Sequence, residues 1–92
     1  MEKQEHDIIT RMNDRYMRMS KGHKAVAAYI SDHYEQAVFM TAAKLGETVG
    51  VSESTVVRFA AALGYEGYPE FQKSLEEWVK NKLNSVQKIG AK

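Results

Sequence analysis

Residues 42–61 read AAKLGETVGVSESTVVRFAA, and this stretch decides the fold. Two short segments with apolar residues at helical spacing are separated by Gly50 and Ser52. Glycine adopts the left-handed conformation of a tight turn without a Cβ penalty, and a serine side chain caps the helix that follows it. Gly46 is small where the second helix would cross closest. Two helices joined at about 90–120° by such a turn form a helix-turn-helix.

The apolar positions of this stretch support the same interpretation. They are predicted to form the inner face of the motif, with Leu45 and Val49 on its first helix, Val51 in the corner, and Val56 and Phe59 on its second helix. The second helix, over about residues 53–63, would stop at Gly64. The stretch therefore predicts a helix-turn-helix whose second helix has a polar outer face.

Apolar residues recur at helical spacing in the flanking sequence too, and alternation of the kind found in strands is missing. Further helices are expected over about residues 7–17, 20–34 and 69–84, with Ser20 and Thr41 as N-caps. Together with the motif they predict an all-α, homeodomain-like domain of five helices spanning residues 1–84. The connector 35–40 should insert Val38, Phe39 and Met40 into the core, and residues 85–92 are expected to be a frayed tail or the start of a linker.

Composition excludes several classes of protein. The chain has 92 residues and no cysteine, so it supports one modest core and neither disulfides nor a thiolate zinc site. No stretch of 18 apolar residues and no apolar leader is present, which predicts a cytoplasmic protein without membrane contact. His6, His23 and His33 lie on different segments, and no catalytic arrangement is visible. We therefore expect no metal, no cofactor and no enzymatic activity.

Five polar residues lie on the outer, N-terminal part of the second motif helix. This is the part that enters the major groove when a helix-turn-helix docks on double-stranded DNA. An arginine there can contact guanine or a phosphate, and hydroxyls can bond to bases. The residues predicted to read bases are Ser52, Glu53, Ser54, Thr55 and Arg58.

The formal net charge is only +1, which is low for a nucleic-acid-binding domain. Residues 11–24, however, hold five basic side chains against Asp14, a local balance of +4. Arg11, Arg15 and Arg18 recur near helical spacing and should mark the solvent side of the first helix. The lysines predicted to contact DNA phosphates are Lys21, Lys24, Lys44 and Lys73.

The stretch VSESTVVRFAAALGYEGYPEFQKSL, residues 51–75, resembles the amino-terminal domain of the RpiR-type family of bacterial transcription regulators. Upstream, SKGHKAVAAYI at residues 20–30 is similar to the start of that family's second helix. The sequence departs from the family pattern at His23, at Ala61 and Ala62, and around Lys73. The family positions that match are Val51, Ser52, Thr55, Val56, Arg58, Phe59, Leu63, Gly64, Tyr65, Gly67, Tyr68 and Phe71.

The resemblance implies a sequence-specific DNA-binding domain of a regulator of sugar or phosphosugar metabolism. It implies a homodimer or higher homo-oligomer, and a phosphosugar effector bound only by a second domain of the sugar-isomerase (SIS) fold. That domain would begin after Lys92, so the chain is expected to be a fragment of a longer regulator, and a natural stand-alone version is the alternative. A helix-turn-helix module used for protein–protein interaction without DNA binding is the alternative that the sequence leaves open.

Overall fold

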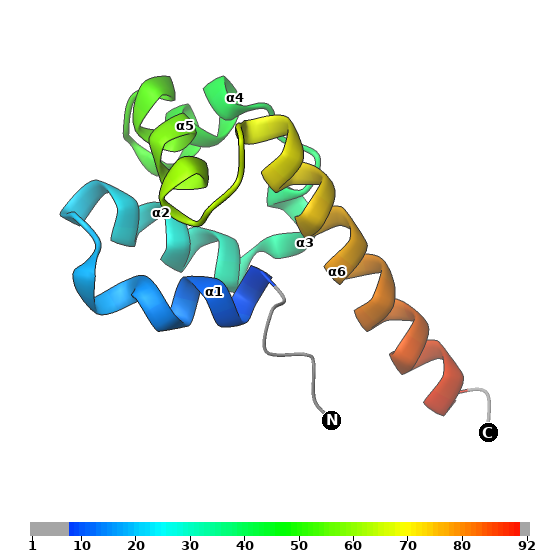
Figure 1. Cartoon of the computed structure of the whole chain (residues 1–92). Coiled ribbons are helices and arrows are strands. Elements are labelled where there is room, and N and C mark those ends of the chain that lie inside the picture. The colour runs from blue at the N-terminus through cyan, green and yellow to red at the C-terminus, as the bar shows by residue number, and fades with distance from the viewer. Residues whose placement is uncertain (1–7, 91–92) are drawn as a thin grey trace.

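The structure is a computed structural model that describes the backbone of residues 8–90 and the side chains of residues 8–82. In that part of the chain all regular elements are helical, so the predicted all-α class is confirmed. In chain order (Figure 1) they are α1 (Ile8–Arg15), the 3-10 helix η2 (Tyr16–Arg18), α2 (Lys21–Asp32), α3 (Tyr34–Ala37), α4 (Ala42–Val49), α5 (Glu53–Ala62) and α6 (Tyr68–Gly90).

Local chemistry starts and stops these helices as the sequence predicts. At three N-caps a side-chain oxygen accepts a hydrogen bond from the backbone N–H three residues on: Ser20 (3.3 Å), Thr41 (3.1 Å) and Ser52 (3.1 Å). Gly50 ends α4 with a φ of 95°. A Cβ on Gly46 would lie 2.7 Å from the backbone oxygen of Val51, so α4 and the turn approach too closely for any other residue. α4 and α5 thus form the predicted helix-turn-helix.

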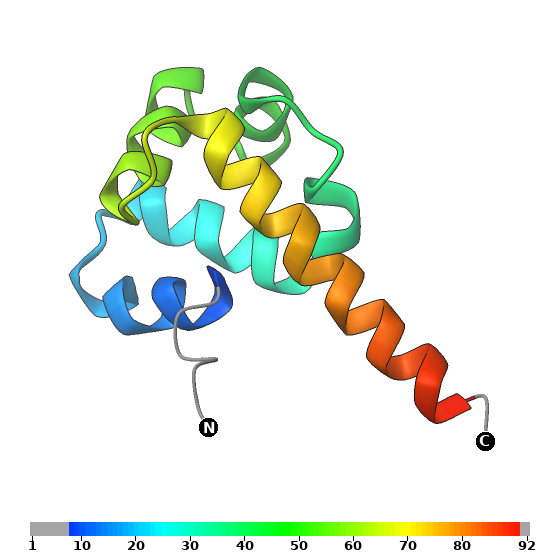
Figure 2. The same ribbon diagram turned by 45° about the vertical axis from the view of Figure 1, so that its right-hand side comes forward.

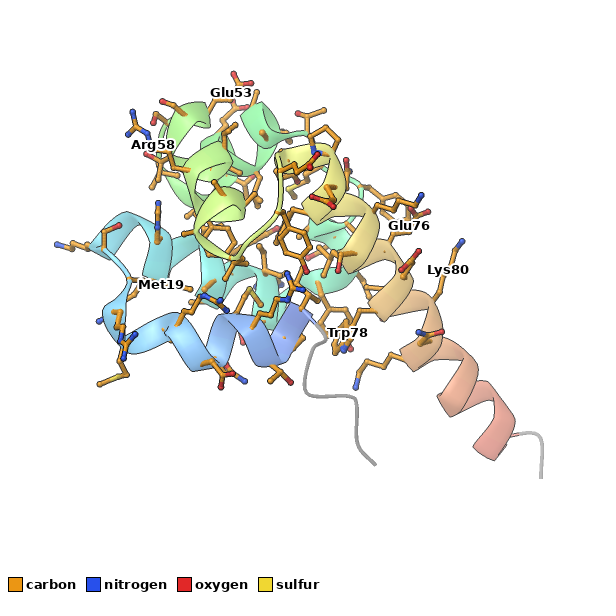
Figure 3. All side chains as sticks on the ribbon, viewed as in Figure 1. Met19, Glu53, Arg58, Glu76, Trp78 and Lys80 are labelled. Atoms are coloured by element: carbon orange, nitrogen blue, oxygen red, sulfur yellow. The ribbon has the colours of Figure 1, made fainter. Side chains whose placement is uncertain are left out.

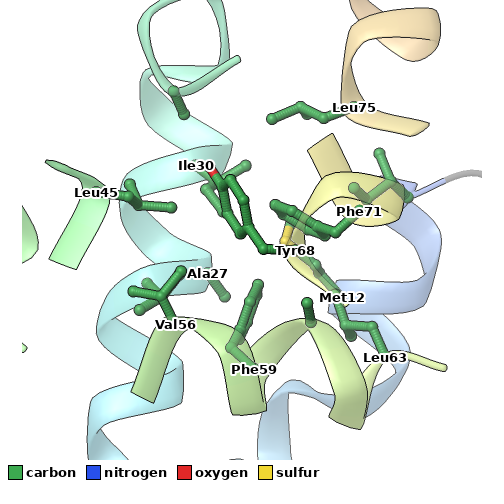
Figure 4. Close-up of a cluster of buried hydrophobic side chains, with 14 of the residues drawn as sticks. Met12, Ala27, Ile30, Leu45, Val56, Phe59, Leu63, Tyr68, Phe71 and Leu75 are labelled. Atoms are coloured by element: carbon green, nitrogen blue, oxygen red, sulfur yellow. The ribbon is translucent and has the colours of Figure 1, made fainter. Parts of the chain in front are cut away.

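One apolar core joins the motif to the flanking helices (Figure 4). Phe59 of α5 meets Phe71 of α6 edge to face, with ring centroids 5.7 Å apart. α6 continues beyond the other helices and leaves the helical body (Figure 2). The fully buried side chains with the largest volumes are Phe59, Phe71, Ile8, Met12, Ile30, Leu45, Leu63, Leu75, Val26 and Val56.

The structure corrects three sequence predictions. The connector contains a further one-turn helix, α3, so the five predicted helices are accompanied by α3 and by η2. Phe39 is not in the core but 85% exposed, because the chain turns after α3 and buries only its neighbour Val38 fully. α6 also runs past residue 84 to Gly90, and residues 91–92 lie outside the described part. The domain boundary at residue 84 stays a prediction.

None of the helices between residues 8 and 90 combines the length and the apolar character that crossing a membrane requires.

Candidate nucleic-acid interface

The inner face of α5 is completely buried. Val56, Phe59 and Ala60 have no solvent exposure, and His23 of α2 packs edge-on against the Phe59 ring with centroids 5.8 Å apart. Side chains packed this closely fix the rotation of a helix about its own axis. The outward direction of the remaining α5 side chains is therefore determined by the core.

The outer face of α5 carries three of the five residues predicted to read bases. Glu53, Ser54 and Arg58 are exposed, and together with Val57 they line an open hollow of about 490 Å³. Glu53 and Arg58 point away from the helical body (Figure 3). A carboxylate, a hydroxyl and a guanidinium, all facing solvent from one helix, can accept and donate hydrogen bonds to base edges.

The other two predicted base-reading residues are engaged in the N-cap of α5. The Ser52 hydroxyl accepts from the Thr55 backbone N–H and lies 2.9 Å from the Thr55 hydroxyl. Thr55 is half-buried, and its methyl group would lie 3.3 Å from a Cβ on Gly22. Both residues therefore help to position α5, and a direct contact from either one to a base stays a prediction.

The close approach of Gly22 and Thr55 places the first turn of α2 beside the first turn of α5. Lys21, the first residue of α2, is exposed, whereas Lys24 is half-buried with its ammonium 5.4 Å from the centroid of the Tyr16 ring. Lys44 is exposed in the first turn of α4. Lys73 lines a different groove, between α6 and the segment after α3, so the structure does not gather all four lysines into one patch.

Arg11 does not lie on the solvent side of α1 as predicted. Its Nη1 donates a hydrogen bond to the carbonyl of Leu63 at 3.2 Å, and the guanidinium lies 4.7 Å from the centroid of the Tyr65 ring. The last carbonyls of a helix have no intrahelical partner and carry partial negative charge, which attracts a cation. Arg11 thus links α1 to the end of α5, whereas Arg15 and Arg18 are exposed as expected.

Tyr68 and Gln72 link α6 to the segment that precedes α4. The Tyr68 hydroxyl donates to the carbonyl of Met40 at 2.7 Å, and Gln72 Nε2 donates to the carbonyls of Val38 and Met40 at 2.9 and 3.1 Å. Burial raises the pKa of Tyr68 to about 12, so its hydroxyl keeps its proton at neutral pH. These contacts fix the segment that leads into α4, the first helix of the helix-turn-helix.

Sequence analysis missed Val57. The side chain is 39% exposed and lines the same hollow as Ser54 and Arg58. The signal was present in the sequence, since Val57 is four residues after Glu53 and adjoins the buried position Val56. Apolar residues in a helix usually belong to the core, so the residue type alone does not indicate that Val57 faces outward.

The histidines of the described part contact aromatic rings. His33 lies 4.8 Å from the centroid of the Tyr29 ring, and His23 packs on Phe59. Between residues 8 and 82, no three His, Asp or Glu side chains gather closely enough to hold a metal ion. His6 lies outside the described residues.

Comparisons with known proteins agree with this geometry. Residues 6–82 match the family model described as "Helix-turn-helix domain, rpiR family". The chain is 33% identical to the HTH-type transcriptional regulator YfhH of Escherichia coli over 75% of this chain and 24% of that protein. It is 31% identical to the HTH-type transcriptional regulator HexR of Pseudomonas aeruginosa over 77% and 25%.

The chain spans about a quarter of the length of these curated relatives. No solved structure gives a significant match to it.

Proposed function

This chain belongs to the rpiR family of helix-turn-helix domains, and on that premise we propose that it binds double-stranded DNA sequence-specifically, as the DNA-binding domain of a bacterial transcriptional regulator. The observation that carries the proposal is the division of α5 into two faces. Its inner face is fully buried, whereas Glu53, Ser54, Val57 and Arg58 face solvent around an open hollow. A helix held rigidly from behind with polar groups in front suits insertion into the major groove.

Each exposed α5 side chain has a role in this proposal. Arg58 donates to guanine O6 and N7 or to a phosphate, and Glu53 accepts from the amino group of cytosine. Ser54 bonds to a base or to a phosphate. Ser52 and Thr55 hold the N-terminus of α5 in its geometry, and the free N–H groups of that first turn favour a nearby phosphate.

Lys21, Lys24 and Lys44 supply phosphate contacts beside the groove. Lys21 is at the start of α2, whose first turn touches α5, so a strand that flanks the groove at α5 would pass within its reach. The positive end of the α2 dipole adds to this attraction. A contact from Lys73 would need a DNA backbone that also passes α6.

At the level of the whole regulator, the family resemblance supports a homodimer whose two recognition helices lie about 34–36 Å apart, one turn of B-DNA. It also supports control of sugar metabolism through a phosphosugar bound by a second, sugar-isomerase domain. A protein that acts on bacterial DNA would work in the cytoplasm.

A salt titration of DNA binding tests the proposal. Random-sequence duplexes selected by the chain should share a motif, and the logarithm of affinity should fall linearly with the logarithm of salt concentration, by about 0.9 for each neutralised phosphate. Lys21→Ala should make this slope shallower by about one.

Arg58→Ala should weaken binding to the selected motif by about tenfold or more, the range of one bidentate base contact. Lys80→Ala is the matched control because it removes the same charge from α6, far from Arg58 (Figure 3), and should leave affinity nearly unchanged. An affinity that does not respond to salt, or equal losses in the two variants, would contradict DNA binding by α5 and favour protein–protein interaction.

A further inference from the structure

The outer face of α5 contains one apolar group among its polar neighbours. Val57 is 39% exposed although Val56 beside it is completely buried. Glu53 precedes Val57 by four residues and Ser54 by three, so both lie next to it on the helix surface. The Val57 side chain thus forms an apolar part of the hollow's wall, and Glu53, Ser54 and Arg58 form the polar remainder.

Packing within the described part of the protein does not explain why Val57 faces solvent. Among the side chains of residues 8–82, those that line the hollow all belong to α5, so no other helix of this part of the chain packs over Val57 there. An exposed valine also lowers the helix propensity of this turn relative to alanine, because its β-branched side chain loses rotamer freedom. Val57 therefore contributes less than an alanine would to the helix itself, and little to the core.

We propose that Val57 is a specificity-determining residue that contacts the 5-methyl group of a thymine in the major groove. The inference rests on the proposed function, because it requires α5 to lie in that groove. Among the four bases only thymine presents an apolar group there, and apolar side chains are its usual partners. The carboxylate of Glu53 would repel phosphates, so the hollow suits a base edge better than a DNA backbone.

The position of this thymine follows from helix geometry. Consecutive residues of an α-helix rise about 1.5 Å, whereas stacked base pairs are about 3.4 Å apart. Val57 and Arg58 therefore reach neighbouring base pairs, because a thymine and a guanine belong to different pairs. The motif that the chain selects should contain a thymine within about two base-pair steps of the guanine contacted by Arg58.

The test replaces single thymines of the selected duplex by deoxyuridine, which lacks only the 5-methyl group. With the unaltered chain, uracil at one position should weaken binding about fourfold, the factor that corresponds to one methyl group withdrawn from water. In Val57→Ser the uracil and thymine duplexes should bind equally at that position. In Val57→Ile, the matched control that keeps an apolar side chain, the penalty should persist.

The outcomes separate the two levels of the proposal. Salt-dependent binding to a defined motif in which every uracil penalty is unchanged by Val57→Ser would overturn the role of Val57 and leave DNA binding intact. The absence of any selected motif and of salt-dependent binding would overturn the proposed function and the thymine contact with it. Both substitutions are at an exposed helix position, and circular dichroism should show the fold unchanged.

Discussion

Gly46 is the residue on which the angle of the helix-turn-helix depends most. The nearest atoms to a Cβ at this position belong to the backbone of Val51 and Ser52, at 2.7 and 3.2 Å, and backbone atoms cannot move aside as the end of a side chain can. Gly46→Ala should therefore push α4 away from the turn and lower the free energy of unfolding by about 1–3 kcal/mol, as overpacking does. Urea denaturation measures this loss.

Gly22→Ala is the control for that experiment. The added methyl group would meet only the ends of side chains, Thr55 at 3.3 Å and Val51 at 3.7 Å, and alanine is a better helix former than glycine. The free energy of unfolding should change by less than about 1 kcal/mol. Equal losses in the two variants would show that the close approach at Gly46 does not matter.

Arg11 links two positions that are 52 residues apart in the sequence, through its hydrogen bond to the Leu63 carbonyl. Arg11→Ala should lower the free energy of unfolding by about 1.5–3 kcal/mol, the usual contribution of a hydrogen bond from a charged group. Arg15→Ala removes an exposed charge from the same helix and should cost less than about 0.5 kcal/mol. Thermal unfolding that is the same for both variants would contradict the proposed link.

Tyr68 gives the fold a dependence on alkaline pH. Its pKa is raised from 10.0 to about 12, so the unfolded chain loses this proton first as pH rises. The stabilising contribution is complete below the unfolded pKa of 10.0 and is lost as pH rises towards about 12. Tyr68→Phe should be less stable at neutral pH, because the bond to Met40 is missing, and should lose less stability in that alkaline window. Denaturant titrations at several pH values measure the free energy of unfolding. If it falls equally between pH 10 and 12 in the unaltered chain and in Tyr68→Phe, this role of Tyr68 is contradicted.

These residues show which features the sequence could predict. The caps at Ser20, Thr41 and Ser52 depend on a backbone N–H three residues away, so local sequence is sufficient. The role of Arg11 depends on a carbonyl 52 residues away, and no local pattern indicates such a contact. Val57 is an intermediate case. Its helical spacing from Glu53 predicts an outward position, whereas its apolar side chain is typical of a buried residue.

At the scale of elements, the segment around α3 shows how tertiary contacts decide burial. Val38 and Phe39 are neighbours and both apolar, yet only Val38 is buried. Hydrogen bonds from Gln72 and Tyr68 fix the carbonyls of Val38 and Met40, and so set which side chain turns inward. Sequence analysis could place the connector but not its rotation, because the partners of these carbonyls belong to α6.

Paired substitutions test this orientation. Val38→Ala should lower the free energy of unfolding by about 1.5 kcal/mol, from two buried methyl groups. Phe39→Ser should change it by less than about 0.5 kcal/mol because the ring already faces water. Chemical denaturation measures the free energy of unfolding of both variants. A larger loss for Phe39→Ser than for Val38→Ala would show that Phe39 is buried.

For the whole molecule, net charge conceals the feature that matters for binding. The total of +1 includes a local excess of four positive charges over residues 11–24, although Arg11 is partly withdrawn into the fold. Non-specific attraction to DNA grows with the number of phosphates neutralised. We expect one isolated domain with few such contacts to bind weakly, and two domains on paired half-sites to bind much more tightly.

The central claim is that the outer face of α5 contacts DNA. The most direct test is a titration of the chain with its selected duplex, followed by backbone amide chemical shifts in NMR spectra. The largest changes should occur at residues 52–58 and in the first turn of α2 around Lys21, with small changes along the groove of Phe39, Lys73 and Lys80. Changes centred on that groove, with residues 52–58 unaffected, would contradict the claim.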